Sequence, residues 1–209
     1  MEDVLELYHR PYDPNIPVVC MDEQPVQLVK ETRRPLRARR GRLRRYDYEY
    51  ERAGTACLFM FTEALGRRRQ VSIRPQRTAV DWAYELREVL NGKYASADKV
   101  ILVCDNLNTH KVASFYEAFT PAEARRLAER LEIHYTPKHG SWLNIAECEL
   151  SVVTRHCPRE RTASIAALRR KVNPWAKERN RRQCGVDWQF TTDNARIKLK
   201  RLYPYIQMS

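Results

Sequence analysis

The stretch Val18-Val19-Cys20-Met21-Asp22 is a short apolar run that contains β-branched residues and ends at an acid. A second run of the same kind, Leu102-Val103-Cys104-Asp105, lies further along the chain. Runs of this length and composition are typical of buried strands. In a mixed sheet two such strands can lie side by side, and their carboxyl ends then bring Asp22 and Asp105 within reach of each other. These two stretches therefore predict both the sheet and the place of a site on it.

The residues around these runs alternate between predicted strands and helices. Hydrophobic periodicity predicts further strands at 46–51, 55–62, 70–74, 133–136 and 186–192, and helices at 78–91, 112–119, 121–131, 141–157, 164–182 and 193–202. Early strands followed by strands that alternate with helices indicate an α/β fold. Its mixed sheet has antiparallel strands first, then parallel ones, with helices on its faces. Pro174 predicts an interruption of the helix at 164–182.

We expect three parts of the chain: an N-terminal arm at 1–15, a catalytic domain at 16–160 and a basic helical extension at 161–209. No window approaches the roughly 20 consecutive apolar residues of a membrane span. Residues 1–10 lack the apolar run of a secretory signal. The six cysteines include no C-x-x-C pair, which argues against a cysteine zinc site and for reduced thiols. We therefore expect a cytoplasmic protein with no membrane partner.

Positive charge is concentrated in two blocks. The net charge is +12, and residues 30–45 hold eight arginines and one lysine against one glutamate. Residues 155–182 hold ten basic residues against two glutamates. Such blocks attract a polyanion, and arginine favours phosphate because it binds it bidentately. The predicted DNA-binding residues of the first block are Arg33, Arg34, Arg37, Arg39, Arg40, Arg42, Arg44 and Arg45. The alternative is a solvated loop.

A third acid joins the two aspartates as a candidate catalytic residue. Glu147 lies in the helix predicted at 141–157, where Asn144 and Ser151 share its face. Glu149 is its rival on the same helix, but it faces the apolar side and is expected at the rim of the core. Three clustered carboxylates repel one another unless a hard cation lies between them, and magnesium suits oxygen ligands of this kind. Two such ions can clamp an in-line phosphoryl displacement.

Five further residues carry weaker predictions. Ser141 is expected to cap the helix that follows, and Asn144 to assist Glu147. His139 lies at the entrance of that helix, where backbone N–H groups favour anions. His110 either contacts a phosphate or a metal-bound water, or has a core role. Trp142 is expected to fill the core rather than to stack on a base.

The sequence resembles the catalytic domain of the mariner-like DDE transposases, in particular their bacterial insertion-sequence branch. The segments that carry the resemblance are Val18–Glu23, Tyr48–Thr55, Asp105-Asn106-Leu107-Asn108-Thr109-His110 and Ser141-Trp142-Leu143-Asn144-Ile145-Ala146-Glu147. It covers about residues 16–160 and implies a ribonuclease H-like fold built on a five-stranded sheet. The three acids of the family fall on Asp22, Asp105 and Glu147. Asn106 and His110 belong to the second motif and are expected to support the site.

The resemblance also implies a reaction and its partners. It implies DNA cleavage and strand transfer with two Mg²⁺ ions held by Asp22, Asp105 and Glu147, with Mn²⁺ able to substitute. The expected partners are element ends, target DNA and a second copy of the chain. The expected location is the bacterial nucleoid.

Two features depart from the family pattern. The 41 residues between Asp105 and Glu147 exceed the usual spacing. The 21 residues before Asp22 leave no room for helix-turn-helix domains, so we expect a separately encoded DNA-binding half. A nuclease without strand transfer and an inactive DNA-binding remnant stay open as alternatives.

Overall fold

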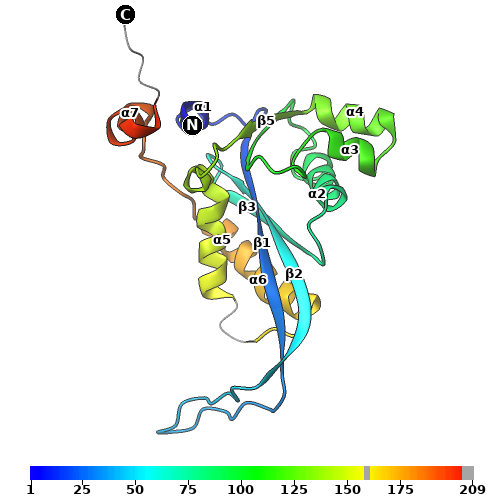
Figure 1. Cartoon of the computed structure of the whole chain (residues 1–209), viewed down its shortest axis with the longest axis vertical. Coiled ribbons are helices and arrows are strands. Elements are labelled where there is room, and N and C mark those ends of the chain that lie inside the picture. The colour runs from blue at the N-terminus through cyan, green and yellow to red at the C-terminus, as the bar shows by residue number, and fades with distance from the viewer. Residues whose placement is uncertain (158–160, 204–209) are drawn as a thin grey trace, which may run out of the picture.

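The computed structural model describes residues 1–157 and 161–203. Its centre is a five-stranded sheet in the order β3-β2-β1-β4-β5 (Figure 1). The long strands β1 (Val18–Glu31) and β2 (Tyr50–Glu63) pair antiparallel, as do β2 and β3 (Arg68–Arg74). The short strands β4 (Val100–Cys104) and β5 (Leu131–Tyr135) run parallel to β1. The predicted mixed sheet, antiparallel strands first, is confirmed.

Helices cover both faces of this sheet. One face carries α2 (Ala79–Asn91), α3 (Ala113–Ala118) and α4 (Pro121–Glu129). The other carries α1 (Glu2–Tyr8), α5 (Ile145–His156), α6 (Ile165–Arg181) and α7 (Thr192–Lys198). Two short 3₁₀ helices lie at Ser141–Leu143 and Lys200–Leu202. In the described part of the chain, no helix is both long and apolar enough to cross a lipid bilayer.

The alternation of side chains along β1 divides the core in two. Val18 and Cys20 point into the cluster under α1, α5 and α6, whereas Val19 and Met21 point into the cluster under α2 to α4. A strand buried on both faces needs a continuous apolar run. This requirement explains why residues 18–21 contain no polar side chain.

Several predicted boundaries are wrong. Residues 46–49 are not a strand: β1 runs on to Glu31 and β2 begins only at Tyr50. The stretch 186–192 is irregular up to the start of α7. α6 continues through Pro174, because proline removes one backbone hydrogen bond while the apolar face of this helix stays buried at Leu168 and Val172.

The ends of the described chain pack onto the sheet. Val4, Leu5 and Leu7 of α1 are fully buried. Leu168 of α6 and Ala195 of α7 belong to the same core cluster.

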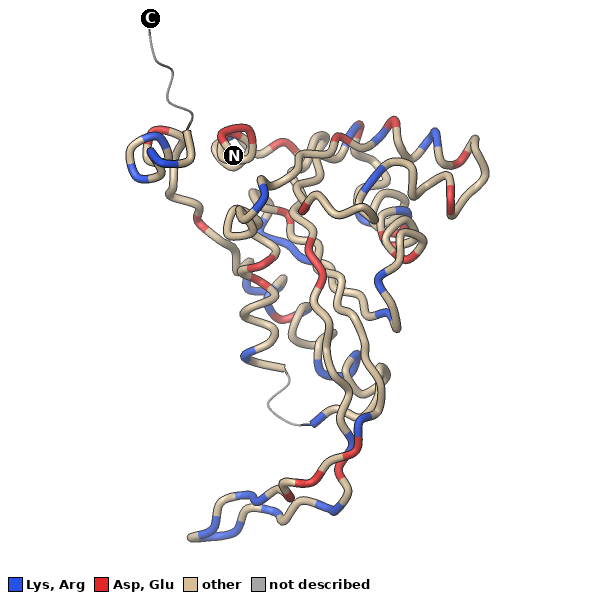
Figure 2. The backbone as a smooth tube through the Cα atoms, viewed as in Figure 1, with Lys and Arg blue, Asp and Glu red and all other residues tan. Residues whose placement is uncertain are grey.

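Residues 32–49 form an arm that extends beyond the sheet from the far ends of β1 and β2 (Figure 2). The two sides of this arginine arm meet at two isolated bridges, Leu36 with Arg45 and Arg39 with Arg42. Gly41 turns the chain between them with φ of +76°, a conformation that favours glycine. The arm contains all eight predicted DNA-binding arginines, and Figure 2 shows the basic residues along its length.

Candidate active site

Asp22 lies just beyond the point where β1 and β4 separate. The parallel pairing of the two strands ends at Cys20 and Val103, and Asp105 follows the last residue of β4. Asp22 does not end its strand as predicted, because β1 continues as the antiparallel partner of β2 and pairs Asp22 with Met60. Both aspartates nevertheless lie at the carboxyl end of the parallel part of the sheet.

The charges of the other two acids act on Asp22. Burial raises the pKa of Asp22 to about 6, and the negative charges of Asp105 and Glu147 add to the rise. The backbone N–H of Glu23 donates to Asp22 Oδ1 at 2.7 Å and opposes this shift in pKa. The charges of Asp105 and Glu147 therefore act on Asp22 in the same direction as burial.

Glu147 and Asp22 line a common groove of about 430 Å³ between β1 and α5. Ser151, which was predicted to share the helix face of Glu147, lines the same groove, as does Thr154. The residues that line the groove are Asp22, Glu23, Gln24, Glu147, Leu150, Ser151, Thr154 and Arg155. The hydroxyl of Thr154 donates to Gln24 Oε1 at 2.7 Å and joins the two walls. The groove therefore combines acids with one arginine.

Glu149, the rival of Glu147, has a different environment. Its side chain is 1% exposed, and Arg179 binds both of its oxygens, at 2.7 and 3.0 Å. Arg69 of β3 lies 3.1 Å from the same carboxylate. Glu149 is thus a buried residue whose ion pairs join α5 to α6 and β3, and the prediction that it lies at the rim of the core is wrong. Glu147 is exposed, which leaves it available for a ligand.

The start of α5 is attached to β1 by one side chain. Asn144 caps the helix by accepting from the backbone N–H of Ala146, and its Nδ2 donates to the carbonyl of Met21 at 2.8 Å. The prediction that Ser141 caps the helix is wrong. Ser141 is exposed in the preceding 3₁₀ turn, and α5 begins only at Ile145. Asn144 therefore fixes the helix that carries Glu147 to the residue before Asp22.

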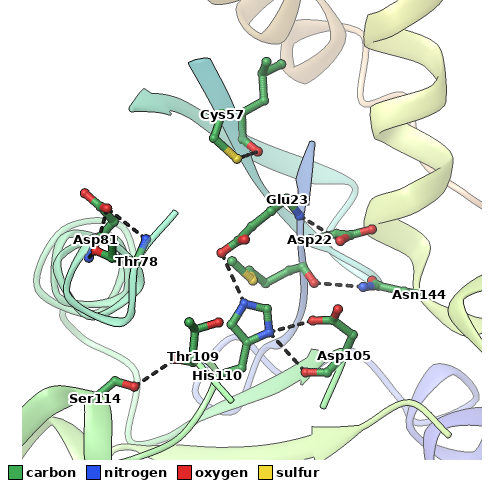
Figure 3. Close-up of polar contacts among 12 residues, drawn as sticks. Asp22, Glu23, Cys57, Thr78, Asp81, Asp105, Thr109, His110, Ser114 and Asn144 are labelled. Atoms are coloured by element: carbon green, nitrogen blue, oxygen red, sulfur yellow. Dashed lines mark hydrogen bonds and ion pairs between the residues drawn. The ribbon is translucent and has the colours of Figure 1, made fainter. Parts of the chain in front are cut away.

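His110 lies buried between two acids (Figure 3). Its Nδ1 lies 2.6 Å from Asp105 Oδ1, and its Nε2 lies 3.1 Å from Glu23 Oε1. Burial lowers the pKa of His110, but hydrogen bonds to Asp105, Cys104 and Glu23 raise it overall to about 12. Sequence reasoning did not select Glu23, although an acid directly after Asp22 was the available signal.

The remaining predicted residues do not line the groove. Asn106 and His139 are exposed in loops, and His139 has φ of +63°. Trp142 is 41% exposed and stacks on Trp188, with ring centroids 6.4 Å apart, so its predicted core role is wrong. Figure 2 shows the arginine arm extending away from the sheet, and none of its eight arginines lines the groove.

The donor set of the groove suits a hard divalent cation. Carboxylate oxygens on an open groove are the ligands that magnesium and manganese prefer, and magnesium keeps several waters. Within residues 1–157 and 161–203, no three His, Cys, Asp or Glu side chains are close enough to enclose an ion by themselves. The predicted ligands Asp22, Asp105 and Glu147 therefore do not enclose a cation by themselves, and an ion held here would also need oxygens from water or phosphate.

Solved structures of similar fold include complexes of the Mos1 transposase. The Mos1 mariner paired-end complex with Mn matches with a TM-score of 0.55 and 16% identity, over 87% of this chain and 55% of that one. The Mos1 strand transfer complex matches with a TM-score of 0.56 and 15% identity, over 84% of this chain and 51% of that one. A pre-cleavage Mos1 transpososome matches with a TM-score of 0.54 and 15% identity, over 90% and 61%. This chain spans only about half to three fifths of those chains.

The likeness to the Mos1 chains confirms the ribonuclease H-like fold. No curated protein matches the chain. Residues 17–169, which are most of the sequence, match the family described as DDE superfamily endonuclease. On that match, the chain belongs to the DDE superfamily of endonucleases.

Proposed function

We propose that this chain is the catalytic domain of a bacterial insertion-sequence transposase of the mariner-like group, with Asp22, Asp105 and Glu147 as its catalytic acids. The observation that carries the proposal is geometric: Asp22 and Glu147 line one groove, and Asp105 directly follows β4, the strand that pairs parallel with β1. Asp22 has a raised pKa because it is buried and because Asp105 and Glu147 repel its charge. Acids that disfavour one another's ionisation are the expected ligands of a cation that neutralises them.

The reaction proposed is cleavage of DNA followed by strand transfer. The three acids would hold two Mg²⁺ ions, or Mn²⁺ in their place. When bound, these ions would activate the attacking oxygen and stabilise the leaving one. Asp22 and Glu147 would hold the cations from opposite walls of the groove, β1 and α5. Water would attack first and free a 3′-hydroxyl, and that hydroxyl would then attack target DNA.

DNA binding is assigned to two sets of basic residues. Arg155 lies in the wall of the groove, beside Ser151, and can contact the phosphate that reacts. The eight arginines of the arm would bind the backbone further along the duplex without reading its sequence. His139, in its exposed loop before α5, is a further candidate phosphate contact.

The assembly proposed follows from the Mos1 complexes, which are described as paired-end and strand transfer complexes. Two copies of this chain would hold two element ends. A separately encoded helix-turn-helix half would recognise the end sequences, and the complex would work on the bacterial nucleoid.

Incubating end-labelled transposon DNA with a target plasmid tests the function. Wild-type protein should yield nicked and then joined products with Mg²⁺ or Mn²⁺ and none with EDTA, and Asp105→Asn should yield none under either condition. Nicks without joined products would identify a nuclease that lacks strand transfer. Binding without metal-dependent cleavage would identify an inactive remnant and refute the proposal.

A further inference from the structure

The contacts of His110 give it a role that is separate from binding DNA or metal. We propose that His110 is a positioning residue: its ring joins Asp105 to Glu23 of β1 and so holds one oxygen of Asp105, leaving the other for the cation. The inference rests on the proposed function, because it takes Asp105 as a ligand.

Both edges of the ring are occupied. Nδ1 lies 2.6 Å from the Asp105 carboxylate and 3.1 Å from the Asp105 carbonyl oxygen, and Nε2 lies 3.1 Å from Glu23 Oε1 (Figure 3). The side chain of His110 is 1% exposed and that of Glu23 is 3% exposed. A ring with no free nitrogen and almost no exposed surface cannot reach a phosphate or a metal-bound water without losing one of these contacts. The ligand alternative from the sequence is therefore the weaker one.

The ring is itself held by neighbours on two sides. The indole of Trp82 in α2 stacks on it, with ring centroids 5.6 Å apart and planes 21° from parallel. The hydroxyl of Tyr135 in β5 donates to the backbone carbonyl of His110 at 2.7 Å. The hydroxyl of Ser114 donates to the carbonyl of the preceding residue, Thr109, at 2.8 Å. Contacts from α2, α3 and β5 thus fix where the ring lies.

Asp105 needs such a partner because it lies outside the strand ladder. β4 ends at Cys104, and residues 105–107 have no regular secondary structure. The Asp105 side chain is 38% exposed, so without His110 its carboxylate would rotate toward water. Partners that orient a metal-ligating carboxylate typically change metal affinity or activity by about 10–100-fold when they are removed.

Two conservative variants of His110 test its contact with Asp105 and its contact with Glu23 separately. In His110→Asn the amide nitrogen takes the place of Nδ1 and can still donate to the Asp105 carbonyl oxygen while lying beside its carboxylate. In His110→Gln the longer side chain places its amide near Nε2, toward Glu23, and the bond to Asp105 is lost. His134→Asn is the matched control, because His134 lies between Asp3, at 2.7 Å, and Glu132, at 3.0 Å, outside the acidic groove.

The readout is the rise in melting temperature on titration with Mn²⁺ in the absence of DNA, together with the Mn²⁺ concentration for half-maximal cleavage. His110→Gln should need about 10–100-fold more Mn²⁺ in both measurements. His110→Asn should stay within roughly threefold of wild type on the same scale, and His134→Asn should match wild type. Equal losses in His110→Asn and His110→Gln, or a wild-type response in His110→Gln, would overturn the inference.

A second pair of variants covers the case in which His110→Gln does not fold. Glu23→Gln keeps an oxygen that accepts from Nε2 and should preserve the Mn²⁺ response, whereas Glu23→Ala should weaken it. Equal responses of these two variants would also count against the inference. A Mn²⁺ response that Asp105→Asn abolishes but His110→Gln retains would refute the positioning role alone. The absence of any Mn²⁺ response in the wild type would refute the metal site as well.

Discussion

The acidic groove lies beside β1, and the arginine arm continues from the far end of the same strand, but the two regions differ in how firmly their side chains are held. Asp22 directly follows the part of β1 that is buried on both faces, and its neighbours Glu23 and His110 are held by contacts from several elements. The arm leaves the far end of β1, and its two sides are joined by two isolated bridges and by side-chain contacts such as that of Arg33 with Asp47. Chemistry requires oxygens at defined positions, whereas attraction to a phosphate backbone requires only charge and reach. Changes in the two regions should therefore alter different measurements.

The largest effect is expected for the acids themselves. Asp22→Asn and Asp105→Asn should abolish cleavage, because each removes a charge that would bind the cation. The affinity for DNA in EDTA should stay within about twofold of wild type, since most of the proposed phosphate contacts lie on the arginine arm. Gel-based cleavage and fluorescence anisotropy measure the two quantities. Cleavage that survives either substitution would show that the groove is not the reaction centre.

Neutralising the arginines of the arm should weaken DNA binding without changing the stability of the protein. Replacing Arg37, Arg39, Arg40 and Arg42 with Gln should lower the slope of log affinity against log salt by up to about 3.6, because each phosphate contact contributes about 0.9. Melting temperature should not change, since these side chains are exposed. The control replaces Arg125 and Arg126 of α4, which are also exposed, and is matched to the double variant that replaces Arg39 and Arg40 alone. An equal loss of salt dependence in the control would mean that the arm is not a specific contact surface.

Glu149→Gln should separate stability from chemistry within one helix. It leaves Arg69 and Arg179 facing a neutral side chain in a buried site, so the free energy of unfolding should fall by about 3–5 kcal/mol. Glu147→Gln, two residues away and exposed, should leave that free energy unchanged and abolish cleavage. Urea denaturation of both variants makes the comparison. If Glu147→Gln is the less stable of the two, the roles of these glutamates have been exchanged.

A smaller effect is expected where the arm joins the body. The Arg161 guanidinium binds Glu31 at 2.7 Å and also donates to the backbone carbonyls of Asp47, Tyr48 and Glu49 at the base of the arm. Arg161→Ala should loosen this base and weaken DNA binding a few-fold, with faster trypsin cleavage inside the arm. Arg161→Lys keeps the charge but not the fork of donors, so it should resemble the alanine variant in the trypsin assay. A wild-type digestion rate in both would show that the arm is held by other contacts.

A further effect concerns pH and stability in metal-free buffer. The folded-state pKa of Asp22 is raised from 3.8 to about 6, so folding disfavours its ionised form. The resulting loss of stability is absent below pH 3.8, grows as pH rises, and is complete above about pH 6. Asp22→Asn should therefore be more stable than wild type at pH 7, and the gap should close toward pH 4. Melting curves in EDTA measure the gap, and a constant gap would exclude this source of it.

Much of the fold was predictable because its signals are local. The apolar runs of β1 and β4, the capping residues Thr78 and Thr120, and the proline that opens α4 each act on residues beside them in the chain. The predictions failed where a distant partner decides. The isolated alternation of residues 46–51 resembles a strand, but this segment has no ladder partner until Tyr50. Ser141 is a good capping residue, but Asn144 caps α5 because it also binds β1.

Charged residues, buried runs and acids that follow strands can all be read from the amino-acid order, because composition and periodicity depend only on near neighbours. The partner of each acid depends on the folded chain: Glu149 faces two arginines, Glu23 faces His110, and Glu147 faces the groove. The physical reason is that these pairings join residues far apart in sequence, and helical or strand periodicity specifies the face of a side chain but not the group that meets it there.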